Sequence, residues 1–196
     1  MGVIDRSGHW SPAAVVVVRE GCCFPGSERG LSSTGAMDAI DLLTQHHRQL
    51  ERQMEALKGA EVVDEAEFAR AADEFVMHVT VEETLFYPAV KARRTEDILL
   101  ESLEEHLSLK RVLADLLAIA PGDAKFGPKL HVLAEQLAHH HEEEEEHLFP
   151  KVRKVLGGDD LAALGDEMEE RMRALAAAGG ARRRVLVQTV DSAPLV

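Results

Sequence analysis

The chain has 196 residues, which is enough for one domain with a full hydrophobic core. Its formal net charge is −13, so we expect neither nucleic acid nor an anionic membrane among its partners, whereas cations should be attracted. Aromatic residues make up only 4% of the chain, and abundant Leu, Ala and Glu favour helix over sheet.

Residues 1–36 are rich in Gly, Pro and Ser and lack helical periodicity, which predicts a flexible leader. Met37 opens the first patterned segment and raises the hypothesis that translation begins there. The apolar run from Ala13 to Val18 is too short for a membrane span or a signal-peptide core. Adjacent Cys22 and Cys23 indicate no disulfide framework, and we expect a cytoplasmic protein.

From Met37 onward, apolar residues recur with a period near 3.6, which is typical of amphipathic helices. Short connections between four long helices predict an all-α fold, an antiparallel up-down-up-down four-helix bundle over residues 37–157. An additional amphipathic helix is expected at 158–178, followed by a flexible tail at 179–196. The four bundle helices are expected at about 38–57, 64–88, 95–119 and 124–156, with Pro88 ending or kinking the second.

Two segments, 78–88 and 140–150, follow one pattern at an offset of 62 residues. In each, a His lies ten residues before a proline, a Glu six before it, a second Glu five before it and an aromatic residue one before it. The preceding helices carry His47 and His106 at an offset of 59 residues. The chain therefore reads as two similar helical hairpins.

Residues four apart lie on one face of a helix, so each segment presents an imidazole and a carboxylate to the same side. His78 pairs in this way with Glu82, and His140 with Glu144. Four imidazoles and two carboxylates suit Fe, Mn or Zn and contain too much nitrogen for Ca or Mg. The pattern predicts a site for two metal ions in the bundle interior.

Over about residues 38–156, these motifs and the Phe-Tyr-Pro and Leu-Phe-Pro endings resemble the hemerythrin-like, HHE cation-binding family. The resemblance implies two non-haem iron ions, oxo- or hydroxo-bridged, with Mn or Zn less expected. It implies that both glutamates bridge the metals. The implied ligands are His47, His78, Glu82, His106, His140 and Glu144.

The chain departs from the oxygen-carrying members of the family. They have a second His four residues after the one on the third helix, where this chain has Lys110, and a His-xxxx-Asp pattern that is absent here. We therefore expect one iron to be more open to water, peroxide or nitric oxide, and simple oxygen transport to be disfavoured. Members often read Asp-His on the first helix, where this chain has His46-His47.

Other ligand registers remain open, because His46, His139, His141 and His147 compete with the chosen histidines. A ferritin-like site needs Glu-xx-His on two helices, and only Glu144 with His147 has that spacing.

Three functions remain. The first is a di-iron protein that binds or senses O₂, NO or peroxide, or handles iron; the second is a di-iron enzyme with catalase-like or NO- or peroxide-consuming activity; the third is a metal-free helical interaction module. No nucleophile elbow, Walker loop or dinucleotide fingerprint is present, and no catalytic residue is assigned. A protein partner is compatible with the sequence, which does not indicate an oligomeric state.

Overall fold

The computed structural model describes residues 3–4, 10–11, 37–92 and 95–196, which fall into two compact units, Met1–Ser33 and Thr34–Val196. In the first unit, β1 (Val3–Ile4) and β2 (Trp10–Ser11) form an antiparallel pair, with Val3 opposite Ser11. The rest of the predicted leader lies outside the described residues, as do Cys22, Cys23 and the run from Ala13 to Val18.

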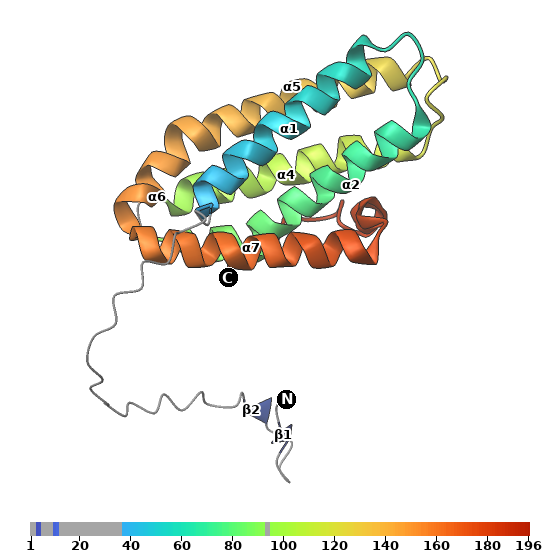
Figure 1. The fold of residues 1–196 in the computed structure, drawn as a ribbon. Coiled ribbons are helices and arrows are strands. Elements are labelled where there is room, and N and C mark those ends of the chain that lie inside the picture. The colour runs from blue at the N-terminus through green and yellow to red at the C-terminus, as the bar shows by residue number, and fades with distance from the viewer. Residues whose placement is uncertain (1–2, 5–9, 12–36, 93–94) are drawn as a thin grey trace, which may run out of the picture. The chain divides into compact units, whose positions relative to one another are not determined.

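The second unit is an antiparallel helical bundle of the predicted up-down-up-down topology (Figure 1). Its long helices are α1 (Ala39–Gly59), α2 (Glu65–Val81), α4 (Glu96–Leu117) and α5 (Phe126–Glu143). Asp38 caps α1 by accepting hydrogen bonds of 2.9 Å from the Ile40 and Asp41 amides, and Asp64 caps α2 through the Glu67 amide at 2.8 Å. The all-α bundle expected from the 3.6 periodicity is confirmed.

Two widened turns interrupt the second and fourth predicted helices. The π-helical segment η1 (Glu82–Phe86) separates α2 from α3 (Tyr87–Val90), and η2 (Glu144–Leu148) separates α5 from α6 (Phe149–Val155). Each turn comes just before a proline, Pro88 or Pro150, which lacks an amide proton and crowds the carbonyl four residues back. The helix widens and continues past Pro88, where the sequence predicted an end or a kink, and both π turns begin at a glutamate of the repeat.

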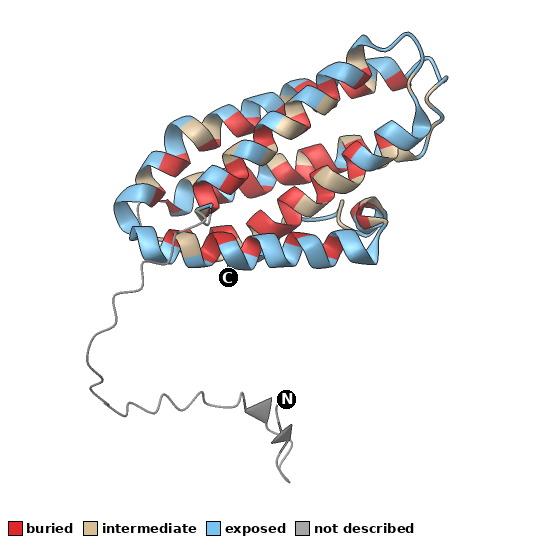
Figure 2. Cartoon of the chain, viewed as in Figure 1, coloured by how far each residue is buried: buried red, intermediate tan, exposed pale blue. Residues whose placement is uncertain are grey.

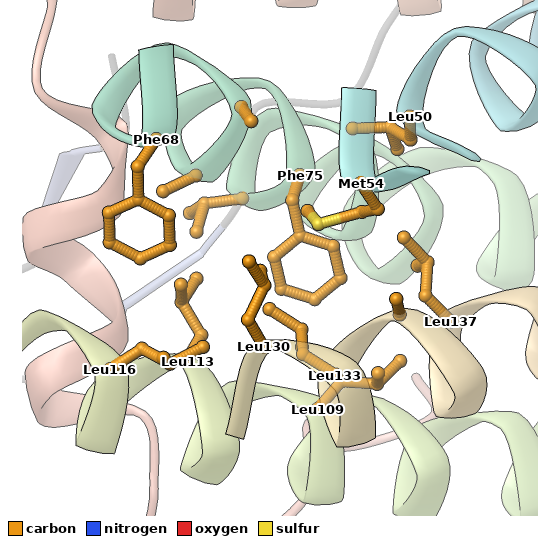
Figure 3. Close-up of a cluster of buried hydrophobic side chains, with 14 of the residues drawn as sticks. Leu50, Met54, Phe68, Phe75, Leu109, Leu113, Leu116, Leu130, Leu133 and Leu137 are labelled. Atoms are coloured by element: carbon orange, nitrogen blue, oxygen red, sulfur yellow. The ribbon is translucent and has the colours of Figure 1, made fainter. Parts of the chain in front are cut away.

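Buried residues lie along the helices of the bundle (Figure 2). Their apolar side chains form two clusters. Figure 3 shows the first cluster, which joins α1, α2, α4 and α5 around Phe75 and Leu113. The second cluster includes Leu43, Phe86 and Leu99 and is extended by residues from α7 (Gly158–Ala178). Along α1, α2, α4 and α5, the histidines of the repeat fall between residues of the first cluster and residues of the second.

Helix α7, the predicted additional helix, packs against α1 and α2 (Figure 1). The predicted tail begins with the 3₁₀ helix η3 (Ala181–Val187), which packs against α2 and α4 and buries Val185. The Asp73 carboxylate accepts a hydrogen bond of 2.7 Å from the Arg182 amide and also pairs with the Arg182 guanidinium. Among the described residues, no helix is long and apolar enough to cross a membrane.

A close backbone approach joins α7 to the start of α1 at Gly165. A Cβ atom at this position would lie 2.9 Å from the Ala39 amide nitrogen and would clash with the Met37 carbonyl oxygen. Both atoms belong to backbone, which cannot rotate away as a side chain can. We therefore expect Gly165→Ala to lower the free energy of unfolding by about 1–3 kcal/mol through overpacking, measured by urea denaturation.

Gly158→Ala is the matched control, because it lies on the same helix and an added Cβ would meet no atom within 4 Å. This control should leave stability unchanged or raise it by up to ~1 kcal/mol through helix propensity. Equal effects of the two substitutions would contradict the close approach of α7.

Candidate metal centre

The six residues of the repeat meet in one buried layer between the two apolar clusters. All six are at most 1% exposed, and α1, α2, η1, α4, α5 and η2 supply them: His47, His78, Glu82, His106, His140 and Glu144. A seventh residue, His141 of α5, is equally buried beside them. The structure thus brings together every residue that the sequence placed at the site and adds a fifth histidine.

Three histidines form the first group of possible metal ligands. Nitrogen atoms of His47, His78 and His141 lie within 4.8 Å of one another. The His47 and His141 rings stack with centroids 3.9 Å apart, and the His78 ring stands edge-on to both. Oε1 of Glu82 reaches this group, at 3.2 Å from Nε2 of His78 and 3.8 Å from Nε2 of His47.

The second group consists of His106, His140 and Glu82. Oε2 of Glu82 lies 3.3 Å from Nε2 of His106, and the two histidine Nε2 atoms are 2.9 Å apart. Glu82 therefore presents one carboxylate oxygen to each group. Oε2 of Glu144 also lies between them, at 3.3 Å from Nε2 of His47 and 3.9 Å from Nε2 of His140. The chain thus offers two adjacent cation sites joined by two carboxylates.

Tyr87 is a further polar group at this centre. Its hydroxyl donates a hydrogen bond of 2.9 Å to Oε1 of Glu144 and lies 3.2 Å from Nε2 of His106. Burial and the negative charge of Glu144 raise the pKa of the Tyr87 phenol well above its ordinary value. Tyr87 was not predicted as a site residue. The signal was a difference within the repeat, because the residue before Pro88 is Tyr87 and the residue before Pro150 is Phe149, which has no hydroxyl.

Carboxylates outside the centre orient four of the five imidazoles. Each carboxylate lies within hydrogen-bond distance of a histidine Nδ1, and Nε2 of that ring then points toward the centre. This arrangement is typical of metal-binding histidines. The contacts are His47–Glu145 at 2.9 Å, His106–Glu83 at 3.0 Å, His140–Glu105 at 2.7 Å and His141–Glu51 at 3.0 Å.

Three of these carboxylates are themselves held by cations. The buried Lys110 ammonium donates to both oxygens of Glu83 at 2.6 and 2.7 Å, and Arg48 donates to Glu145 at 2.5 Å and to Glu51 at 3.2 Å. Lys110 therefore supports the histidine four residues before it from outside the centre. The second histidine of oxygen carriers is absent at the position of Lys110, and the additional buried imidazole is that of His141 on α5.

Most of the donor atoms at the centre are buried without hydrogen-bond partners. Within the described residues, the unpaired buried atoms include both Glu82 oxygens, Oε2 of Glu144 and Nε2 of three histidines, His47, His78 and His141. Unpaired buried polar atoms are costly, and metal coordination is one way to satisfy them. The donor set, nitrogen-rich with bridging carboxylates, fits two transition-metal ions.

Burial and neighbouring charges shift the pKa values of several groups in the centre. Burial alone would lower the pKa of His106, but Glu82 and Glu83 outweigh it and raise that pKa to about 9. Burial likewise opposes ionisation of Glu82, yet hydrogen bonds from His106 and His47 hold the pKa of Glu82 below its ordinary value. Burial lowers the pKa of His141 to about 4, so this imidazole is neutral near pH 7 and able to coordinate.

The competing histidines lie elsewhere. His139 and His147 are exposed, and His46 is half-buried at the edge of the centre. Of the alternatives that the sequence left open, His141 alone provides a nitrogen to the clusters found among the described residues.

Comparison with known proteins agrees with this geometry. The Hemerythrin HHE cation binding domain matches residues 38–152, more than half of the chain, whereas no curated protein matches. Among solved structures, a Hemerythrin HHE cation binding domain-containing protein from Mycobacterium kansasii is similar, with a TM-score of 0.67 and 23% identity. The similarity covers 76% of this chain and 99% of that one, and at this identity it supports the fold alone. The family match and the buried His and Glu clusters together place this chain in the hemerythrin-like, HHE cation-binding family.

Proposed function

We propose that this protein holds a non-haem di-iron centre that binds or senses a small ligand such as O₂, NO or peroxide. The observation that supports this proposal is the position of Glu82, whose two oxygens face two different groups of buried histidines. A carboxylate placed in this way would bridge two metal ions. The ligands are His47, His78 and His141 at one position, His106 and His140 at the other, and Glu82 and Glu144 between them.

Iron is a metal that this donor set fits. Imidazole and carboxylate together suit borderline transition metals, and no thiolate occurs among the donors found in the described residues, which disfavours a soft-metal site. Mn and Zn accept the same donors and compete through availability. When bound, iron supplies redox chemistry and an open position for an exogenous ligand.

The open position lies on the side of His106 and His140. Two six-coordinate ions offer roughly twelve positions; five imidazoles, two bridging carboxylates and a bridging oxygen fill about eleven of them. The group with two imidazoles has fewer donors than the group with three. Tyr87 lies beside it, at 3.2 Å from Nε2 of His106, and its hydroxyl, which donates to Glu144, is placed to contact a ligand there through its oxygen.

Iron content and optical spectra test the proposal. The purified protein should contain two irons per chain and show an oxo-bridge absorption band that shifts with azide, peroxide or NO. Glu144→Ala, which removes a bridging carboxylate, should retain one iron or none and lose the band. Exposed Glu146 lies two residues away, and Glu146→Ala should keep both irons. Full loading of Glu144→Ala would contradict the bridging role.

Two neighbouring histidines test the fifth imidazole. We expect His141→Ala to weaken binding of one of the two metal ions by at least ~10-fold, since it removes a nitrogen donor. His139→Ala changes an exposed residue of the same helix and should leave both dissociation constants unchanged. The measurement is an anaerobic titration of the metal-free protein with Co²⁺, and equal affinities of the two variants would exclude His141 from the ligand set.

An enzyme that disproportionates hydrogen peroxide is the second candidate, favoured by the hydroxyl donor of Tyr87 inside the centre. Two peroxide molecules give two waters and one O₂, so no external reductant is needed. Such a reaction moves protons, and a positioned acid contributes typically ~10²–10⁴-fold to its rate. Tyr87→Phe should lower O₂ release by a factor of this order while iron content is retained. Wild-type protein that holds two irons and releases no O₂ would exclude this activity.

A further inference from the structure

His78 lacks the support that the other histidines of the centre receive. Four of the five contact an outer carboxylate through Nδ1, whereas Nδ1 of His78 has no hydrogen-bond partner among the described residues. The His78 ring is only 1% exposed, so water does not replace the missing partner at the surface. Its Nε2 lies 3.2 Å from Oε1 of Glu82, which is the position of a metal ligand. It lacks the hydrogen bond from Nδ1 to a carboxylate that the other four imidazoles make.

The repeat identifies the residue that stands where a carboxylate would be. In the second hairpin, Glu105 directly precedes His106 on α4 and contacts Nδ1 of His140. The first hairpin places His46 directly before His47 on α1, and His78 is the counterpart of His140. His46 is therefore the counterpart of Glu105. Its ring lies beside that of His78, with centroids 6.3 Å apart, and makes no hydrogen bond to it.

The carboxylates near His46 do not replace the missing partner of His78. His46 lines a cavity of about 280 Å³ between α1, α2 and α7 together with Glu74 and Glu169, and Nδ1 of His78 has no hydrogen-bond partner among the described residues. Glu74 carries the acidic group of α2 in this lining, and the amides of Gln49 and Gln53 donate to its carboxylate at 2.7 and 2.6 Å. Glu74 is thus held on the α1 side of the cavity and does not reach His78.

We propose that His46 is a positioning residue that leaves His78 without carboxylate support and so makes it the weakest imidazole ligand of the centre. The inference rests on the proposed metal-binding function. A carboxylate that accepts the Nδ1 proton makes an imidazole more basic, fixes its orientation and stabilises the more highly charged metal. His46 withholds these effects from the metal position of His47, His78 and His141. That metal is held less tightly, and its ferric state is less stable, than a carboxylate at residue 46 would make it.

The test exchanges the two equivalent residues. His46→Glu supplies the missing carboxylate, His46→Gln supplies a neutral acceptor, and Glu105→His removes the carboxylate from the other hairpin. Two dissociation constants from anaerobic Co²⁺ titration and the reduction potentials of the iron-loaded protein are measured for each variant. Circular dichroism of the metal-free proteins confirms that each is folded, and His46→Asp serves if the longer side chain prevents folding.

His46→Glu should tighten one dissociation constant by roughly 10- to 100-fold and lower one reduction potential, with a smaller effect for His46→Gln. Glu105→His should weaken the other constant by a similar factor. A merely structural role for His46 would change stability but would not tighten metal binding.

A second measurement follows the N–H proton of the His78 imidazole. In the Co²⁺-loaded protein, ligand N–H protons give separate shifted NMR signals, and the one from His78 should exchange with solvent faster than the other four. His46→Glu should slow it to their rate. If His46→Glu changes neither affinity nor exchange while Glu105→His weakens binding, the role of His46 is overturned and the metal centre stands. Wild-type protein that binds no metal overturns the proposed function and this inference with it.

Discussion

The fold depends on one electrostatic constraint, a layer of five imidazoles and two carboxylates buried between two apolar clusters. Such a layer is expensive unless its charges and lone pairs are satisfied. Around it the chain places carboxylates that hold four Nδ1 atoms, and Lys110 and Arg48 donate hydrogen bonds to three of these carboxylates. Most of the inward-facing atoms have no hydrogen-bond partner, so the protein holds the outer nitrogen of four imidazoles and leaves inward-facing donor atoms available to cations. The layer is therefore more than polar filling in a helical core.

The two prolines turn a sequence repeat into this geometry. Each follows a π turn that begins at a glutamate, Glu82 or Glu144, and the widened turn moves the backbone register by about one residue. Without the turn, a proline at either position would face the carbonyl four residues back. Each turn begins at a glutamate that points inward, and at its end Phe86 and Tyr87, or Leu148 and Phe149, point into the second apolar cluster. One device thus serves both the metal layer and the core beside it.

The sequence was sufficient for the parts of the site that obey a period. The 3.6-residue pattern predicted the helices, and the four-residue spacing with the proline register selected six residues that the structure brings together. The sequence did not predict His141, because helix α5 faces two neighbouring helices. Helix α5 meets α4 through His140 and Glu105, and α1 through His141 and Glu51, so consecutive histidines are both buried. The repeat pointed away from His141, because its counterpart in the first hairpin is the apolar Val79. The π turns were missed because i+5 hydrogen bonding leaves no separate hydrophobic period.

The differences between the hairpins matter as much as their similarity. One scaffold repeated twice would give two equal groups of ligands, yet this chain departs from the repeat at three positions in and around the centre. His141 against Val79 gives one position a third imidazole, Tyr87 against Phe149 puts a hydroxyl beside the other, and His46 against Glu105 withholds a carboxylate from His78. These changes act in different directions: the position with more nitrogen donors has the least supported ligand. Under the proposed function, unequal positions would let one ion stay fixed while the other exchanges ligands, which suits the binding of a small molecule at a buried site.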